Sequence, residues 1–470
     1  MNYINAVPRK FSDCTGYLDE KMARYFGGDR ALSENIVVEL LVSTSFGANS
    51  ILYAVWLGYL MGMWAMLIHF AWCMSFCLMA CFSERIYAHT SIHDFLSCLF
   101  GPVTKKLAAI CSIVGLLYFT GWEIAIAKSG LEASSLFPKV NSPYIWSILV
   151  ALVVCIAMLY TVVGGQHANG FFNRIMNKIK LILLVIIAAA VFFALGNSGR
   201  FSAVTLFPSF SDAIRNIGVA GLITNVLLNL FWQFVDNSSW QIISLGCETG
   251  QYSANRALKK TAIQIFAIYA VETFLGASLR GLSGLDSDNI LSGIIYIVGS
   301  YGNIFGFCAI ILILLSMMSL IDGMSLSVAQ TIMVDLDLAK LLNRLRQTHQ
   351  SSSSLRTARV VTLFLGALAA WGIQFLLEGL GSSIFNFVYI FTVVQLGLIG
   401  PIIFGLVFSP KYIPKVWISI AIPIATGFLM NILGGIWGIS WFSDIAGAVT
   451  ATSSFAICLM LYCLSFRKKS

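Results

Sequence analysis

The chain has 470 residues, of which 58% are apolar and only 11% are charged, whereas a soluble globular domain carries roughly 25% charged residues. This composition excludes a water-soluble fold. The net charge of +8 does not indicate a nucleic-acid-binding protein, because the basic residues form no patch along the sequence. The 11 cysteines lie mostly inside apolar runs and form no CxxC pair, so neither disulfides nor a cysteine metal site is predicted.

Apolar runs of about 20 residues, each long enough to cross a bilayer, recur through almost the whole chain. We predict twelve transmembrane helices, near residues 36–60, 63–82, 107–128, 144–163, 178–196, 217–241, 261–279, 303–334, 359–378, 384–408, 415–434 and 446–465. Residues 83–106 and 289–299 are more polar or shorter, and each is predicted to hold a short interfacial helix.

The positive charges orient these helices, because lysine and arginine concentrate in cytoplasmic loops. With a cytoplasmic N-terminus, most of the 29 basic residues fall on the cytoplasmic side, including Lys178 and Lys180 at the start of the fifth span. The exceptions are Lys128, Lys139, Arg200, Arg215 and Arg280. The first 34 residues contain no apolar signal-peptide region. We therefore expect an integral protein of the bacterial inner (cytoplasmic) membrane with both termini cytoplasmic.

Two spans are interrupted by polar residues and glycine. The first contains STSFGANS at residues 43–50, and the sixth contains NLFWQFVDNSSWQ at residues 229–241. Such breaks persist at membrane depth only where they line a cavity or are buried in protein. Each lies in the first helix of a five-helix set, where inverted-repeat transporters place a midplane substrate site. For residues 236–241, a simple helix end remains the alternative.

Ionisable residues inside spans are costly and mark ion or substrate paths. They are Glu39, Glu123, Asp236, Glu272, Asp322 and, at a helix end, Glu378. Glu123 lies deepest by position in its span. No nucleotide-binding loop, zinc-protease motif or nucleophile elbow is present in the sequence, so an enzyme is not predicted.

Several stretches resemble the sodium:solute symporter family, in the order in which that family carries them. They are YFGGDRALS, ERIYAHTSIHDFLSCLFG, YTVVGGQHANGFFNRIM, WQFVDNSSWQ, MSLIDGMSLSVAQTIMVDL and GPIIFGLVFSPK, between residue 25 and about residue 415. The resemblance implies a divergent member with the leucine-transporter-type fold: an all-α polytopic membrane protein with two inverted five-helix repeats plus two C-terminal helices. The expected divisions are an N-terminal cytoplasmic segment, 1–34, a transporter core, 35–410, and a C-terminal helix pair, 411–470.

The resemblance also implies a sodium site, formed by the backbone carbonyls of Ser43, Phe46 and Ser316 and by the hydroxyl of Ser319. Two departures weaken it. Leu320 stands where the family has a second hydroxyl, and Asn173 stands where many members have a carboxylate. Phe172 and Met176 replace further signature residues. Sodium and proton coupling therefore both remain open, and no other cofactor is expected.

For the substrate, the resemblance implies Ala48, Asn49, Ser50, Asn229, Trp232, Tyr389 and Gln395. Gln233 is added because it lies in the second break, and Glu123 because it is a deep intramembrane charge. We expect a secondary active transporter that moves a small polar organic solute across the bilayer by cation symport and alternating access. The alternative is a transporter-like solute sensor that signals through a separate partner. The sequence leaves the oligomeric state open.

Overall fold

A computed structural model describes residues 20–27, 32–132, 144–197, 206–245, 250–280, 303–339, 351–368, 392–408, 413–437 and 440–467, and every element in these ranges is a helix. Starting at the N-terminus, these are α2 (Glu20–Tyr25), α3 (Glu34–Ser45) and α4 (Ala48–Met61). Next come η1 (Gly62–Ala65), α5 (Met66–Cys81), α6 (Ser83–Tyr87), α7 (Ile92–Phe100), α8 (Pro102–Glu132) and α9 (Tyr144–Asn197). The second half holds α10 (Phe210–Ile217), α11 (Val219–Val235), α12 (Asn237–Leu245), α13 (Gln251–Leu279), α15 (Asn303–Gln330) and η4 (Thr331–Asp335). The last described helices are α17 (Ser351–Leu368), α20 (Ile399–Phe408), α21 (Ile418–Trp437) and α22 (Ser440–Arg467).

Seven helical segments among the described residues are long and apolar enough to cross a membrane. Two of them, Ala48–Cys81 and Ile145–Phe193, are 34 and 49 residues long, and each joins two neighbouring predicted spans. Shorter apolar helices at Thr392–Phe408 and Ile418–Gly434 lie within the tenth and eleventh predicted spans. The ninth predicted span, 359–378, is described only as far as Leu368. The chain is thus an all-helical polytopic membrane protein, as predicted.

The outer surface of the helix bundle is apolar, as a protein dissolved in lipid requires. On α9, Leu152, Leu159, Val163 and Phe193 are each more than half exposed. Only 33% of the most apolar part of this segment is buried inside the protein. An apolar side chain that finds no partner inside the bundle is solvated by hydrocarbon in a bilayer, so we assign this face of α9 to lipid.

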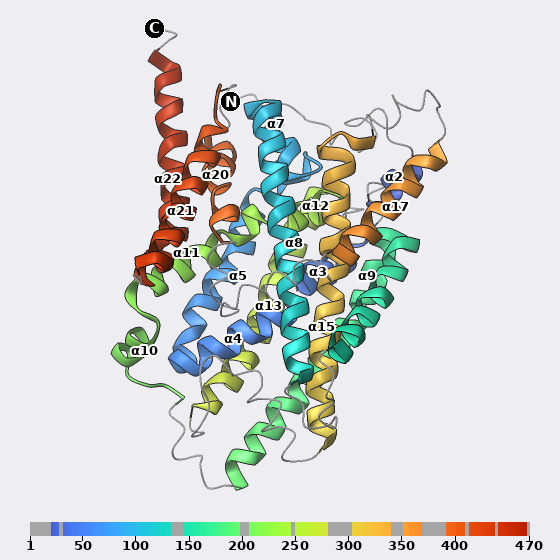
Figure 1. The fold of residues 1–470 in the computed structure, drawn as a ribbon, viewed down its shortest axis with the longest axis vertical. Helices are drawn as coiled ribbons and strands as arrows, with labels where there is room; N and C mark the ends of the chain where they lie inside the picture. Colours follow the sequence, from blue (N-terminus) through green and yellow to red (C-terminus); the bar gives the residue numbers. More distant parts are fainter. Residues whose placement is uncertain are drawn as a thin grey trace.

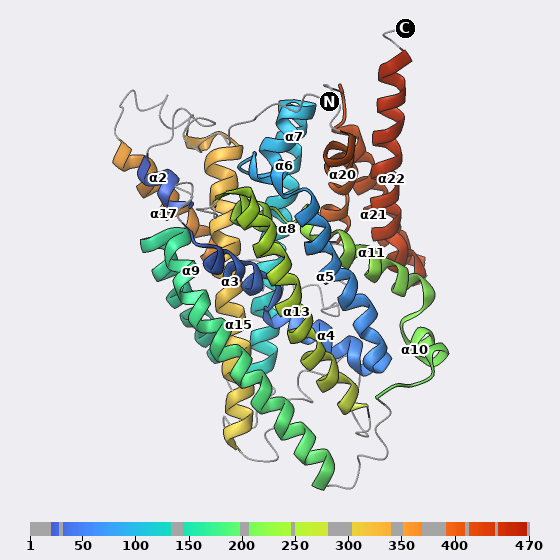
Figure 2. The ribbon, with the colours of Figure 1, turned by 180° about the vertical axis from the view of Figure 1, so that it is seen from behind.

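Both predicted breaks are confirmed. α3 ends at Ser45 and α4 begins at Ala48, with the non-helical residues Phe46 and Gly47 between them. Asp236, with φ −77° and ψ 102°, separates α11 from α12. The sequence after Asp236 is therefore a second half-helix, not the frayed end of a span. In Figures 1 and 2, α3 and α4 lie in the middle of the bundle, between α9, α13 and α15.

The predicted loop between the fourth and fifth spans is wrong in detail, because residues 164–177 are helical except at one point. Gly165, with φ 59° and ψ −144°, is the non-helical residue inside α9. Glycine adopts a positive φ without steric cost. A Cβ here would also collide with the backbone carbonyl of Tyr25. A single glycine thus performs the reversal that was expected to need a longer loop.

The polar segment at 83–106 holds two short helices, α6 and α7, where one was predicted. The predicted helix at 289–299 lies outside the described residues. At the C-terminal end, α21 packs against α22, and α22 also contacts α20 and α11.

Candidate functional site

A cavity lies beside the first helix break and the end of α11 that leads to the second break. Its walls come from α3, α4, α5, α8, α11 and α13, so it is built by both halves of the chain. The lining residues are Thr44, Ser45, Asn49, Ser50, Tyr53, Trp72, Phe119, Trp122, Leu228, Asn229, Trp232, Tyr269 and Thr392. This lining set contains no charged side chain.

Aromatic rings form one wall of this cavity around Trp232. The ring centroids of Trp72 and Trp232 are 5.9 Å apart with an interplanar angle of 19°, and those of Phe119 and Trp232 are 5.3 Å apart. Tyr269 meets Trp72 edge-on at 6.3 Å. Rings in such stacked and edge-on arrangements present flat apolar surface with fixed orientation, which suits a solute with a flat or apolar part.

Amide side chains form the polar edge. Asn229 Nδ2 donates to the Tyr53 hydroxyl at 3.0 Å, and that hydroxyl donates to Asn225 Oδ1 at 2.6 Å. Among the described residues, Asn229 Oδ1, Asn49 Nδ2 and Trp122 Nε1 have no hydrogen-bond partner. Buried polar atoms are normally paired, so these three are available to a bound solute.

The predicted substrate residues divide into two groups. Asn49, Ser50, Asn229 and Trp232 line the cavity. The buried residues Ala48, Glu123, Gln233 and Gln395 are not among its lining residues. Tyr389 lies outside the described residues.

Gln233 has a bridging position between the two half-helices of the second break. Its backbone N–H donates to Ser75 Oγ at 3.2 Å, and its Oε1 accepts a hydrogen bond from Ser239 Oγ of α12 at 2.9 Å. Gln395 is buried, and its Oε1 has no hydrogen-bond partner among the described residues.

Sequence reasoning missed most of the aromatic wall. Trp72, Phe119 and Tyr269 lie in spans that are apolar on every side, so no periodicity shows which face points inward. The only signal was their residue type, because tryptophan and tyrosine combine an apolar body with a polar tip.

The N-terminal end of α4 is occupied by the protein's own carboxylate. Glu123 Oε2 accepts a hydrogen bond from Ala48 N at 2.8 Å, and its Oε1 accepts one from Asn49 N at 2.9 Å. Glu123 is fully buried. The first amides of a helix have no partner within the helix and carry a partial positive charge. The carboxylate of Glu123, on α8, therefore pairs with the N-terminal amides of α4, which would otherwise attract an anionic group.

The opposite side of the same break carries Lys180, which was assigned to the cytoplasmic loop charges. That assignment is wrong, because Lys180 is fully buried in α9. Its Nζ donates to the carbonyl of Phe46 at 2.9 Å and to Ser319 Oγ at 2.7 Å. The ammonium also lies 4.6 Å from the centre of the Phe46 ring, a favourable cation–π position.

The oxygens that Lys180 contacts are two of the four expected to bind sodium. Ser319 Oγ in turn donates to the Ser316 carbonyl at 3.0 Å, so a third is engaged as well. A sodium ion needs these lone pairs for itself, and it would be repelled by an ammonium at hydrogen-bond distance. The residues present therefore do not fit a sodium ion at this position.

Asn173, at a position where the resemblance implied a carboxylate, faces a carboxylate on α15. Its Nδ2 lies 3.4 Å from Asp322 Oδ2, and the Tyr160 hydroxyl donates to the same oxygen at 2.7 Å. The acid missing from α9 at this place is thus matched by an acid on the neighbouring helix.

The second break is satisfied locally. Asp236 Oδ1 accepts from Ser238 N at 3.0 Å, and Oδ2 accepts from Ser239 N at 3.2 Å. The hydroxyls of both serines also donate to this carboxylate. Asp236 is thus an N-cap for α12, and no side chain from a distant helix is needed.

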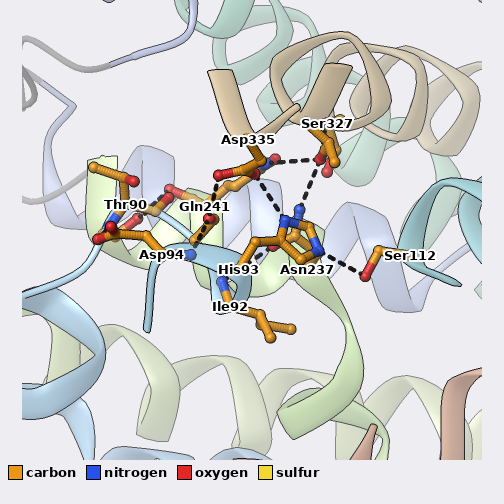
Figure 3. Close-up of polar contacts among 12 residues, drawn as sticks. Thr90, Ile92, His93, Asp94, Ser112, Asn237, Gln241, Ser327 and Asp335 are labelled. Carbon is orange, nitrogen blue, oxygen red and sulfur yellow. Dashed lines mark hydrogen bonds and ion pairs between the residues drawn. The ribbon is translucent and has the colours of Figure 1, made fainter. Parts of the chain in front are cut away.

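A polar network joins α12 to the rest of the bundle beyond this break, as Figure 3 shows. His93 Nδ1 lies 2.7 Å from Asp335 Oδ2, and His93 Nε2 lies 2.9 Å from Ser112 Oγ. Asn237 Oδ1 accepts from Ile92 N at 3.2 Å, while its Nδ2 donates to Thr331 Oγ1 at 3.1 Å. The network connects α7, α8, α12 and η4. Sequence reasoning did not identify it.

A second cavity of about 350 Å³ shares Thr44 with the first. It is lined by Phe26, Leu40, Ser43, Thr44, Gln166, Ser238, Gln241, Ile242, Gly323, Leu326, Ser327 and Gln330. Residues of α3, α12 and α15 surround it, so it lies along the first half-helix of the first break and the second half-helix of the second break.

No family model matches the chain, and no curated protein matches it. Solved structures do. A Na⁺-coupled sialic acid symporter in a substrate-bound outward-open state aligns with a TM-score of 0.69 at 14% identity, over 95% of this chain and 94% of that one. MHP1, a nucleobase-cation-symport-1 family transporter in a closed conformation with bromovinylhydantoin bound, aligns with a TM-score of 0.61 at 12% identity, over 96% of each chain.

MhsT in complex with L-phenylalanine aligns with a TM-score of 0.53 at 14% identity, over 92% of this chain and 97% of that one. All three alignments extend over more than 90% of both chains. At these identities the likeness establishes the fold alone. The chain therefore has the leucine-transporter-type fold that its sequence predicted.

Proposed function

We propose that the protein is a secondary active transporter that moves a small organic solute across the membrane by alternating access, driven by a cation gradient. The central cavity beside the helix breaks carries this proposal. In inverted-repeat transporters, broken helices at the midplane hold the substrate. The second cavity, which shares the lining residue Thr44 with the first, supports the proposal. The similar structures named above are transporters, and a Na⁺-coupled symporter is among them.

The cavity favours a solute with a flat or apolar part and an uncharged polar edge. Trp232 and its neighbours supply ring surface, and Asn49 and Asn229 supply amide groups. A carboxylate on the solute would find no cation among the lining residues and no free amides at Ala48 and Asn49, because Glu123 already accepts from both. We therefore expect an uncharged solute to bind better than the corresponding acid.

A thermal-shift screen of matched pairs tests this solute class. Uracil against orotate, and nicotinamide against nicotinate, differ mainly in a carboxylate. A compound that binds the folded protein raises its Tm. Consistent preference for the acids would contradict the proposed solute class.

Uptake of a stabilising solute into proteoliposomes, with sodium and proton gradients imposed separately, tests transport. Trp232→Ala should abolish most uptake, because it removes the centre of the aromatic wall. Trp437→Ala is the matched control, since Trp437 is 60% exposed at the end of α21. Binding without uptake under any gradient would contradict a transporter and favour a sensor.

We further propose that the protein is a divergent sodium:solute symporter of the bacterial inner membrane, with both termini cytoplasmic. The proposed N-terminal segment, 1–34, precedes a transporter core, 35–410, and a helix pair, 411–470. The distribution of lysine and arginine supports the orientation. In both ribbon views α2, α7 and the end of α22 lie in the same half of the molecule (Figures 1 and 2). A reporter fused after residue 470 should be active only in its cytoplasmic form.

A further inference from the structure

We propose that the ammonium of Lys180 takes the place of a sodium ion at the first helix break, so that this position needs no sodium. The inference concerns the driving ion of the proposed transporter and rests on that proposed function. It is carried by geometry. Lys180 Nζ contacts the Phe46 carbonyl and the Ser319 hydroxyl, which belong to the first and eighth predicted spans. A cation bound there would join these same two helices.

Carboxyl groups from several helices surround the amine of Lys180 at the break. The carboxyl groups that interact electrostatically with Lys180 are those of Asp322, Glu123, Glu272 and Glu39. A buried ammonium without such partners would be very costly. Here it faces the carbonyl end of α3, which carries a partial negative charge, while Glu123 holds the amide end of α4. Each end of the break thus has an opposite charge supplied by another helix.

The side chain of Leu320 also disfavours a sodium ion at the first break. A sodium site would use a second hydroxyl at this position, but leucine offers no oxygen. The leucine packs close to Gly47, where an added Cβ would lie 2.6 Å from Leu320 Cδ1. The side chain therefore closes apolar space around the break where a hydrated ion would need polar ligands. Lys180 then provides the fixed positive charge from α9.

Sodium binding without any solute tests the proposal. The Tm of the purified protein is compared in sodium chloride and in choline chloride at equal ionic strength. The wild type should show no difference between the two salts. Lys180→Ser removes the ammonium, leaves space and adds an oxygen, while the surrounding carboxyl groups remain. This variant should gain a sodium-dependent rise in Tm of roughly 2–4 °C.

Two controls separate the site from general effects of charge. Lys178→Ser removes an exposed lysine of the same helix and should remain insensitive to sodium. Lys180→Met removes the charge but keeps the bulk, and it should gain little or no sodium response. A sodium-induced rise in the wild-type Tm would overturn the proposal, as would a folded Lys180→Ser variant that does not respond.

If Lys180→Ser does not fold, the wild-type comparison decides alone, since insensitivity supports the proposal and stabilisation by sodium overturns it. None of these measurements requires a substrate or transport. Failure to observe uptake would therefore count against the proposed function and leave the assignment of Lys180 intact.

Discussion

The backbone groups at the two helix breaks are capped by different kinds of partner. At the second, Asp236 caps α12 through Ser238 and Ser239, its own neighbours in sequence. At the first, the capping groups come from other helices: Glu123 is 75 residues from Ala48, and Lys180 is 134 residues from Phe46. A local cap forms with its half-helix, whereas a distant cap forms only when the bundle assembles. The first break is therefore more dependent on tertiary structure.

Removing Glu123 should have the largest effect on this comparison. Glu123→Ala leaves two buried amides, those of Ala48 and Asn49, without acceptors, and it removes one of the carboxyl groups that interact electrostatically with Lys180. We expect a loss of about 3–5 kcal/mol in the free energy of unfolding, measured by denaturant titration in detergent. Glu132→Ala, at the exposed end of the same helix, is the control and should change little.

Gly47→Ala tests how tightly the first break is packed. An added Cβ would lie 2.5 Å from Glu123 Oε1 and 2.6 Å from Leu320 Cδ1. Because both neighbours are buried, the expected destabilisation is about 2 kcal/mol.

Gly323→Ala on α15 is the matched control for this substitution, since no atom lies within 4 Å of its added Cβ. It should be neutral or slightly stabilising. Equal effects at Gly47 and Gly323 would show that close packing is not the reason for glycine at the first break.

At the second break we expect a smaller effect that a local substitute repairs. Asp236→Ala should cost about 1–2 kcal/mol through loss of the N-cap, and Asp236→Asn should recover most of it, because asparagine caps well. Glu123→Gln should recover less, because the Glu123 carboxyl group also interacts electrostatically with Lys180, and a neutral amide does not replace that interaction. The four unfolding titrations can be compared directly. A larger loss for Asp236→Ala than for Glu123→Ala would reverse the proposed order of the two breaks.

The smallest effect is expected where the far end of α12 meets the segment before α7. Ser244 Oγ donates to the carbonyl of Thr90, whose N–H donates to Asp94 Oδ2. That carboxylate lies 3.2 Å from His89 Nδ1. Burial by itself lowers the pKa of His89, but its hydrogen bonds to Asp94 and Cys98 outweigh burial and raise the pKa to about 9.

A raised histidine pKa stabilises the fold fully below its unfolded value of 6.5, and this stabilisation is lost as the pH rises through about 9. A double-mutant cycle with His89→Gln and Asp94→Asn should give a coupling of about 1 kcal/mol at neutral pH. The coupling should vanish above the pKa of His89. A coupling that persists there would mean that the pair is held by shape and not by charge.

Hydropathy and local polarity predicted much of this protein because they act over short stretches of chain. An apolar run of about 20 residues must form a helix in lipid, so the transmembrane spans could be predicted from the sequence. STSFGANS was predicted as a break because polar residues interrupt an apolar run, whereas for residues 236–241 a helix end remained the alternative. Of the predicted solute residues inside the breaks, Asn49, Ser50, Asn229 and Trp232 line the cavity, whereas Ala48 and Gln233 do not.

The partners of these breaks could not be predicted in the same way. Lys180 lies close to the basic residues Arg174 and Lys178, so its sequence context indicated a loop. Only the packing of α9 against α3 and α15 shows that it is buried. Likewise Trp72 and Tyr269 lie in helices that are apolar all round, and the bundle alone decides which side faces the cavity.

By itself, then, the sequence determined the helical membrane fold and the polar interruptions in two helices. Tertiary structure decided that Glu123 and Lys180 fill the two ends of the first break, and that aromatic rings from separate helices meet in one wall. The physical reason is the separation along the chain over which each interaction acts. Hydropathy and an N-cap act between near neighbours in the chain, whereas a buried charge finds its partner only when distant helices are brought together.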